Sequence, residues 1–185
     1  MPEGHTVHRT ANEFNRLFAG EKVKVISPQG RFSSSAVKVS DFALVNARAI
    51  GKQLFLEFEN ELTIRIHLGI YGKWSFSQLE GGLSEPVGQV RARFIGSNYF
   101  ADLRGPTVCE VIDSAQVRSV ENRLGPDPLN PNPRGRESKR FIERVLGSKA
   151  PIGLQLMNQD VISGIGNVYR AELLFRAGIS PHKPG

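Results

Sequence analysis

The fold follows from Leu54-Phe55-Leu56-Glu57-Phe58 and Leu62-Thr63-Ile64-Arg65-Ile66, two apolar segments separated by three polar residues. Side chains in both segments alternate with the period of two that is typical of strands. The same period recurs at Val23 and Val25, at residues 36–39 and at residues 90–94, with Gly, Pro, Ser and Asn clusters between the segments. We therefore expect an antiparallel β-sandwich or barrel that extends to about residue 113.

A helix precedes the predicted strands. Its apolar residues recur at helical spacing, and they are Val7, Ala11, Phe14, Leu17 and Phe18. This spacing predicts an amphipathic helix over residues 6–18, and Gly20 offers a stop signal directly after it.

The composition changes at Leu124-Gly125-Pro126-Asp127-Pro128-Leu129-Asn130-Pro131-Asn132-Pro133, where four prolines fall within eight residues. Such a run precludes regular structure and predicts a linker. Beyond it we expect a basic amphipathic helix over residues 138–146 and a short helix from Pro151 to Met157. A third helix is expected over residues 167–177, with its inward residues being Val168, Ala171, Leu174 and Phe175.

These segments predict an α+β chain in three parts. Residues 1–120 form an N-terminal domain with a leading helix and an antiparallel β-sandwich, residues 121–133 form the proline-rich linker, and residues 134–185 form a partial helical domain.

The composition indicates which class of partner the protein binds and which kinds of site it lacks. Among 185 residues, Lys and Arg number 24 against 18 Asp and Glu, so the formal net charge of +6 favours a polyanionic partner. The single cysteine, Cys109, excludes an internal disulfide and a cysteine-rich metal site. No signal peptide and no apolar run of about 18 residues is evident, so we expect a cytosolic protein with no membrane partner.

The first residues carry a possible catalytic group. If Met1 is removed, the chain begins with the secondary amine of Pro2, followed by the carboxyl group of Glu3. An amine can attack the anomeric carbon of a sugar to give an imine, and an α-amino group has a reference pKa of about 7.7–8.0 that leaves a neutral fraction near pH 7. Glu3 could transfer protons beside it. The alternative is that Pro2 and Glu3 form an ordinary frayed terminus.

A glycine-rich turn, Ser163-Gly164-Ile165-Gly166-Asn167, leads into the third predicted helix. Backbone N–H groups at a helix N-terminus form an anion site. The alternative is an ordinary turn between helices.

Several motifs together resemble those of the formamidopyrimidine-DNA glycosylase and endonuclease VIII family. They are Pro2-Glu3-Gly4, Gly51-Lys52, His67-Leu68-Gly69, residues 124–129, Gln155-Leu156-Met157, residues 164–169 and Glu172-Leu173-Leu174-Phe175. The match covers residue 2 to about residue 181, and residues 70–74 are more similar to the endonuclease VIII branch. The resemblance implies a β-sandwich domain, a helix-two-turn-helix domain and duplex DNA in the cleft between them, with the damaged nucleotide flipped out of the stack.

The resemblance also implies an activity in base excision repair. The Pro2 nitrogen would attack the sugar C1′, release an oxidised base and leave a Schiff base, and elimination would then cut the strand. This is a bifunctional DNA glycosylase and abasic-site lyase. Glu3 would transfer protons, and Lys52 would contact phosphate and assist acid–base steps, although a lysine at a strand end is often merely exposed.

Five further residues are implied to contact DNA. Asn167 and His67 would bind the backbone, Ile70 and Tyr71 would fill the gap left by the flipped base, and Arg104 would face the orphaned base. Without the resemblance, His67 could be a hydrogen-bonded structural residue, Ile70 and Tyr71 could pack in the core, and Arg104 could be a solvated turn residue.

The chain departs from the family pattern in two places. His5-Thr6-Val7-His8 stands where many members have a second acidic residue, and either histidine could replace it or be inert. The family also continues beyond the position of Gly185 with a four-cysteine zinc finger, which one cysteine cannot form. We therefore expect a truncated chain with no cofactor of its own, weaker and salt-sensitive DNA binding, and exposed apolar surface around Leu173, Leu174 and Phe175.

Three hypotheses remain open. The first is the glycosylase and lyase, acting as a monomer on double-stranded DNA that contains oxidised bases or abasic sites, in a bacterial cytosol. The second is a non-catalytic DNA-binding fragment of the same family. The third is an RNA-binding β-barrel with helices, which would not need Pro2.

Overall fold

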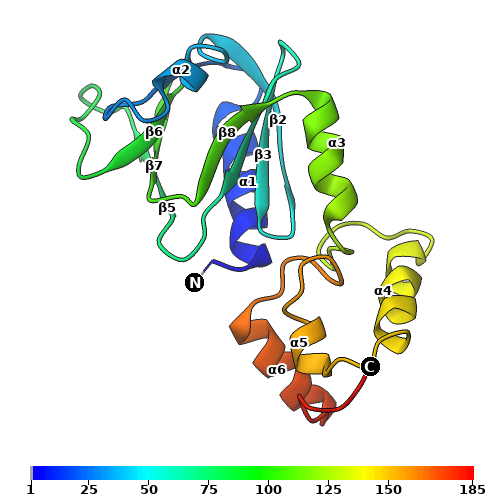
Figure 1. Ribbon diagram of the computed structural model, residues 1–185. Coiled ribbons are helices and arrows are strands. Elements are labelled where there is room, and N and C mark those ends of the chain that lie inside the picture. Colours follow the sequence, from blue (N-terminus) through cyan, green and yellow to red (C-terminus); the bar gives the residue numbers. More distant parts are fainter. Residues whose placement is uncertain (1) are drawn as a thin grey trace.

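The computed structural model describes residues 2–185 (Figure 1). In chain order the elements are α1 (Gly4–Phe18), β1 (Lys22–Ile26), α2 (Ser33–Ala36), β2 (Phe42–Ile50), β3 (Gln53–Phe58), β4 (Thr63–His67), β5 (Lys73–Gln78), β6 (Val90–Ile95), β7 (Tyr99–Arg104), β8 (Val108–Ile112), α3 (Ser114–Arg123), α4 (Arg136–Leu146), α5 (Ile152–Gln155) and α6 (Asn167–Ala177). None of the helices in this range is both long and apolar enough to span a membrane.

Within these residues the strands form one eight-stranded antiparallel sheet, in the order β5-β7-β6-β1-β2-β3-β4-β8. β1 and β2 share only two residue pairs, Lys22 with Ala43 and Val23 with Phe42, whereas β3 and β4 pair from Gln53 with His67 to Glu57 with Thr63. The short β1–β2 junction divides the sheet into a half with β5, β6 and β7 and a half with β2, β3, β4 and β8. Figure 1 shows these halves at the left and in the centre.

Helix α1 packs against both halves. The Phe14 ring, 1% exposed, lies 4.9 Å from the Trp74 ring and 5.5 Å from the Phe94 ring, between centroids, in the β5–β6 half. In the other half, the Asn15 side chain pairs with both the N–H and the C=O of Ala47 at 2.7 Å. Apolar side chains from α1 and from both halves thus form one core, and the predicted α+β fold with an antiparallel sheet is confirmed.

The strand predicted over residues 36–39 is wrong. The chain there forms α2 and the turns after it, and its buried residues are Phe32, Ala36 and Val39, which follow helical spacing rather than alternation. α1 begins two residues earlier than predicted. Helix α3 was not predicted, and it runs across residue 120, where we expected the first domain to end.

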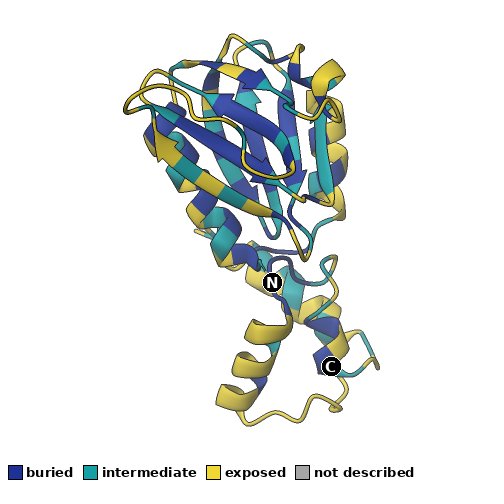
Figure 2. Cartoon of the chain, turned by 90° about the vertical axis from the view of Figure 1, so that its left-hand side faces the viewer, coloured by how far each residue is buried: buried dark blue, intermediate teal, exposed yellow. Residues whose placement is uncertain are grey.

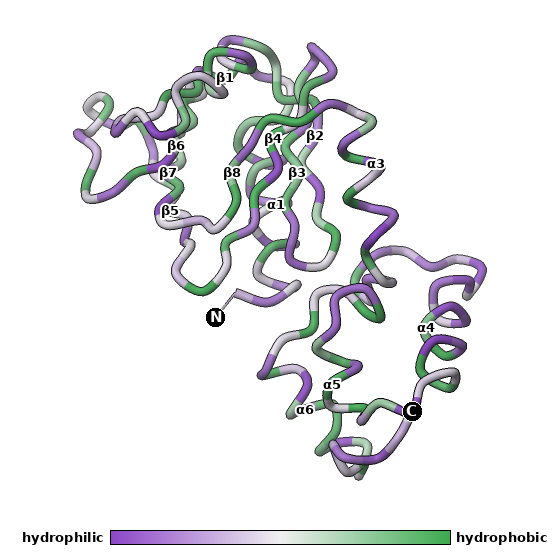
Figure 3. The backbone as a smooth tube through the Cα atoms, in the orientation of Figure 1, coloured by the Kyte–Doolittle hydropathy of each residue, from purple (hydrophilic) through white to green (hydrophobic). Residues whose placement is uncertain are grey.

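The helical region after the linker has a small core of its own, formed by Leu156, Ile162, Ile165 and Leu174. α6 has the predicted bounds, but of its predicted inward residues only Leu174 is buried, while Val168 and Phe175 are 63% and 85% exposed and Ala171 is exposed. No element of residues 2–185 covers that face of α6. Figure 2 shows the contrast between the mostly buried sheet and the mostly exposed helices, and Figure 3 shows how hydrophilic the chain is from the linker into α4.

Candidate active site

Glu3 joins the β-sheet domain to the helical region. Its side chain is buried, and its carboxylate accepts hydrogen bonds from the backbone N–H groups of Gly166, Val168 and Tyr169 at 3.1, 2.9 and 3.2 Å. These donors belong to the first turn of α6, so the carboxylate meets the positive end of the helix dipole. The glycine-rich turn therefore binds an anion as predicted, but this anion is a protein carboxylate.

Gly166 allows the close approach that this contact needs. A Cβ atom at residue 166 would lie 2.6 Å from Cδ and Oε1 of Glu3. Any side chain larger than hydrogen would displace the carboxylate from the helix terminus.

Three other glycines bring three chain segments together. The Gly4 N–H donates to the Gly164 C=O at 2.8 Å, and a Cβ atom at Gly164 would lie 3.4 Å from the Gly4 Cα and 3.3 Å from the Gly51 Cα. Gly51 and Gly164 both have positive φ, at +58° and +92°, which glycine adopts without strain. The start of α1, the β2–β3 turn and the turn before α6 thus meet backbone against backbone.

Asp127, in the linker, fixes the β2–β3 turn from the other side. Its Oδ2 accepts from the Gly51 N–H at 2.6 Å and from the His8 ring at 2.8 Å, and its Oδ1 accepts from the Leu129 N–H at 2.9 Å. Residues 124–133 carry no helix or strand, whereas residues 121–123 of the predicted linker belong to α3, and Asp127 is buried. An irregular segment is thereby anchored firmly against the turn that carries Lys52.

Lys52 and Pro2 line one cavity of about 260 Å³, together with His67, Ile70, Met157 and Gln159 among others. Burial lowers the pKa of the Lys52 ammonium below its usual value, and the negative charge of Glu3 opposes this shift. Pro2 also lines a second cavity, of about 410 Å³, between α1 and β5. Three predicted catalytic residues, Pro2, Glu3 and Lys52, therefore lie together, while the predicted removal of Met1 concerns a residue outside the described range.

Comparison with known proteins shows the family. The pattern of the formamidopyrimidine-DNA glycosylase N-terminal domain matches residues 1–109, and that of the formamidopyrimidine-DNA glycosylase H2TH domain matches residues 124–185. A protein of Mycobacterium tuberculosis named endonuclease 8 1 is 50% identical over 190 residues, which cover 100% of this chain and 69% of that protein. The chain belongs to the formamidopyrimidine-DNA glycosylase and endonuclease VIII family of DNA-repair glycosylases.

Other relatives agree with this membership. The formamidopyrimidine-DNA glycosylase of Rhodospirillum rubrum is 32% identical over 196 residues, covering 100% of this chain and 68% of that protein. The structure of MutM in complex with DNA containing carbocyclic 8-oxo-G superposes with a TM-score of 0.82 at 22% identity, over 99% of this chain and 72% of that one. Lactococcus lactis Fpg bound to DNA with an AP site gives a TM-score of 0.79 at 20% identity, over 98% and 72%. These structural matches show the fold.

In this glycosylase-family chain, Ile70 and Tyr71 lie in the β4–β5 loop and do not pack in the core. They are 64% and 83% exposed, although both are apolar or aromatic. The alternative that they are core residues is wrong, and an exposed apolar pair at the edge of the cavity is what a wedge requires. Their insertion into DNA stays a prediction.

His67 ends β4 beside the Lys52 cavity, paired in register with Gln53. Burial lowers the pKa of its imidazole, and the neighbouring charges of Arg65 and Lys52 lower it further. Asn167 begins α6 and is exposed, next to the residues that hold Glu3. His67 lines the cavity, and Asn167 lies beside the backbone groups that bind Glu3. The contacts of both residues with DNA stay predictions.

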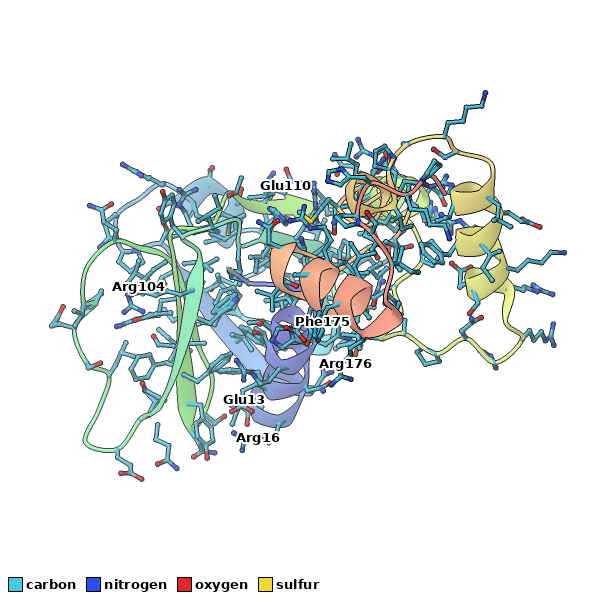
Figure 4. All side chains as sticks on the ribbon, turned by 90° about the horizontal axis from the view of Figure 1, so that it is seen from below. Glu13, Arg16, Arg104, Glu110, Phe175 and Arg176 are labelled. Carbon is cyan, nitrogen blue, oxygen red and sulfur yellow. The ribbon has the colours of Figure 1, made fainter. Side chains whose placement is uncertain are left out.

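Arg104 is not the solvated turn residue of the alternative interpretation, and its contact with the orphaned base stays a prediction. It is the last residue of β7 rather than a solvated turn residue, and its guanidinium donates to the Val87 C=O at 2.9 Å, to Ser75 Oγ at 2.7 Å and to Asp102 at 2.9 Å. Asp102 also pairs with the buried Arg93. Figure 4 shows Arg104 among the strands, away from the α6 residues Phe175 and Arg176. Contact with a base would require some of these bonds to open.

Two residues that position the site were not predicted from the sequence, Asp127 and Gln159. Asp127 was noted only as part of the linker motif, and its isolation between two prolines was the available signal. Gln159 was not noted at all; its side chain accepts from the Gly164 N–H at 3.0 Å and donates to the Ile165 C=O at 3.0 Å, which fixes the turn before α6.

The described residues do not provide the four-cysteine zinc site that the family resemblance implies. Residues 2–185 contain no cluster of three His, Cys, Asp or Glu side chains that could hold a metal ion. Cys109, on β8, is partly buried, and burial raises the pKa of its thiol to about 12, so it is a poor ligand.

Proposed function

We propose that this chain is a base-excision glycosylase with abasic-site lyase activity, in which the N-terminal proline amine is the nucleophile. The observation that carries the proposal is that Pro2 and Lys52, from two separate chain segments, line one cavity, while Glu3 directly follows Pro2 and its charge acts on Lys52. A frayed terminus would not place a buried Glu3 on the α6 N-terminus with three hydrogen bonds.

The proposed chemistry begins once Pro2 carries a free secondary amine. Its nitrogen forms a bond to the sugar C1′, the bond from C1′ to the damaged base breaks, and the base leaves with a proton. Opening of the sugar at the C1′–O4′ bond gives an iminium ion and a protonated O4′. Loss of a proton from C2′ then drives elimination of the 3′ phosphate, and a second elimination releases the 5′ phosphate.

Lys52 and Glu3 suit the proton transfers in these steps. The lowered pKa of Lys52 raises the fraction of neutral amine that can accept a proton. Glu3 follows Pro2 directly, and its carboxylate is held in one orientation by the α6 N–H groups, so its position relative to the amine is fixed.

Duplex DNA is the proposed substrate, with oxidised bases or abasic sites as targets. Relatives are named endonuclease 8 and formamidopyrimidine-DNA glycosylase, and solved structures of the same fold hold DNA with a carbocyclic 8-oxo-G or an AP site. The exposed Ile70 and Tyr71 at the cavity, and the net charge of +6, support the same substrate.

Borohydride trapping on a duplex with one abasic site tests the proposal, with Pro2→Gly as the comparison and intact mass used to confirm that Met1 is absent. We expect the unaltered protein to form a covalent adduct with DNA. The adduct must map to the N-terminal residue by peptide mass.

Replacement of Lys52 by Gln should slow adduct formation without abolishing DNA binding. If folded protein that lacks Met1 gives no adduct, the catalytic proposal fails. Binding of the same duplex in a gel shift would then favour the non-catalytic DNA-binding alternative.

A further inference from the structure

His8 lies one turn of α1 beyond the residues of the proposed reaction, in the segment where this chain departs from the family pattern. Its Nε2 lies 2.8 Å from Oδ2 of Asp127, and the two side chains are 21% and 2% exposed. A carboxylate can only accept a hydrogen bond, so Nε2 carries the proton in this contact. His8 is therefore a donor to a buried acceptor, rather than an inert surface histidine.

The same carboxylate oxygen reaches the turn that carries Lys52. Oδ2 of Asp127 accepts from the Gly51 N–H at 2.6 Å, and the neighbouring Asn130 side chain donates to the Ala49 C=O, on β2, at 3.1 Å. The linker thus contacts both the last residues of β2 and the turn after it. His8, Asp127 and Gly51 form one continuous chain of hydrogen bonds from α1 to this turn.

We propose that His8 is a positioning residue, which acts through Asp127 to hold the Gly51–Lys52 turn at a fixed distance from Pro2 and Glu3. The chain of bonds begins on the helix that directly follows Pro2 and Glu3, and it ends at the turn that carries Lys52. α1 carries Glu3 at its N-cap and His8 in its second turn, so a contact from His8 fixes the Gly51–Lys52 turn relative to the helix that directly follows Pro2.

The buried carboxylate of Asp127 explains why a hydrogen-bond donor such as histidine suits position 8. Asp127 is the one side chain of residues 2–185 that pairs with His8, and no Lys or Arg in that range lies within salt-bridge distance of Asp127. A buried carboxylate is destabilised when it loses a hydrogen-bond donor, and besides His8 the donors to Asp127 are the Gly51 and Leu129 N–H groups and, at 3.4 Å, the Asn130 side chain. Loss of the His8 donor would therefore allow the Asp127 carboxylate to move. The Gly51 N–H, which bonds to the same oxygen, would then be less firmly held.

The proposal rests on the proposed function, and single-turnover trapping on the abasic duplex tests it. His8→Phe keeps a ring but removes the donor, His8→Gln restores a donor, and Asn12→Ala is a matched control because Asn12 is exposed one turn further along α1. We expect His8→Phe to slow trapping at saturating protein by on the order of tenfold to a hundredfold, as for a misplaced catalytic group. His8→Gln should recover most of the rate, and Asn12→Ala should match the unaltered protein.

The concentration that gives half-maximal trapping separates positioning from DNA binding. Positioning predicts that it stays the same in His8→Phe while the maximal rate falls. An unchanged rate in His8→Phe, a change in the half-maximal concentration alone, or a His8→Gln rate as low as that of His8→Phe would each overturn the proposal. If His8→Phe does not fold, as judged by its thermal transition, His8→Leu takes its place.

A measurement without DNA keeps this test separate from the proposed function. In protein labelled with ¹³C at lysine Cε, the Lys52 signal, assigned with Lys52→Gln, reports the titration of its amine. The pKa of Lys52 is lowered by burial, so a loosened turn should shift it upward in His8→Phe and not in Asn12→Ala. No shift would overturn the positioning role even if trapping showed that the unaltered protein is a lyase, and a shift would support it even if the unaltered protein trapped no DNA.

Discussion

The sheet domain and the helical region after the linker are packed in different ways. In the first, Phe14 is 1% exposed and contacts aromatic rings from β5 and β6, within a core that includes both halves of the sheet. In the second, four buried side chains form the core, and Phe175 is 85% exposed. The residues from Gly164 to Tyr169 therefore join the two regions, because Ile165 lies in the small helical core while Gly164, Gly166, Val168 and Tyr169 bond to Gly4 and Glu3.

The largest expected effect is on the core of the sheet domain. Phe14→Ala would leave a cavity among Phe18, Trp74, Phe76 and Phe94, because Phe14 contacts all four rings. Replacement of a buried phenylalanine by alanine costs about 3–5 kcal/mol of unfolding free energy. Urea unfolding followed by the fluorescence of Trp74, the only tryptophan, measures the loss. A loss well below this range would mean that α1 does not join the two halves of the sheet.

The contact between the two regions depends on Gly166. Gly166→Ala would place Cβ 2.6 Å from the Glu3 carboxylate, and overpacking of this kind costs about 1–3 kcal/mol. The φ of Gly166 is −126°, which alanine adopts freely, so the expected effect is steric. We expect a lower unfolding midpoint and slower abasic-site trapping.

A double-mutant cycle isolates the Glu3 contact. Glu3→Ala removes the group that the new Cβ would strike, so the pair of substitutions should destabilise the protein by less than the sum of the two single changes. Strict additivity would show that Gly166 is needed for another reason.

The sequence predicted elements well where one period covers the whole segment. β3, β4 and α6 were found because their apolar residues alternate or recur over their full length, and α1 was found to within two residues. Residues 36–39 were misassigned because Val37 and Val39 suggest alternation, whereas the structure buries Phe32, Ala36 and Val39 at helical spacing and leaves Val37 72% exposed. α3 was missed although Asp113 and Gln116 form a capping box, a local signal that was present in the sequence.

The candidate site could be predicted in its residue types but not in its connections. Pro2 and Glu3 were predicted from their amine and carboxyl chemistry and Lys52 from the motif resemblance, and Pro2 and Lys52 line one cavity. That Glu3 occupies the predicted anion turn, and that Asp127 joins His8 to Gly51, depends on three segments far apart in the chain. No periodicity or local spacing encodes such pairings, because they arise only when the domains are docked.

A smaller effect on the unfolding free energy is expected at His67, the last residue of β4 in the sheet domain. Its pKa is lowered from 6.5, first by burial and then by Arg65 and Lys52, so below pH 6.5 the unfolded chain binds a proton that the folded chain does not. The unfolding free energy should therefore fall as the pH drops below 6.5, and it should fall less in His67→Gln. Urea unfolding at pH about 7.5 and about 5.5 measures this difference.

His182→Gln is the control for that measurement, because His182 is exposed near the C-terminus. Its pH dependence should equal that of the unaltered protein. If the unfolding free energy fell equally in His67→Gln and in the unaltered protein, the lowered pKa of His67 would not be the cause of the fall.

The smallest effect on stability is expected at Phe175, and it completes the contrast with Phe14. The same residue type lies 1% exposed on α1 and 85% exposed on α6, so only the first loses packing when it is replaced. Phe175→Ser should change the unfolding free energy by no more than about 0.5 kcal/mol, as is usual for exposed positions. It should also reduce binding of a hydrophobic dye and light scattering on concentration, because Phe175 lies beside Leu154 and Ile179 on an apolar cavity of about 550 Å³. A loss of several kcal/mol would instead show that α6 is packed on this face in solution, and the division into a firmly packed sheet domain and a thinly packed helical region would be wrong.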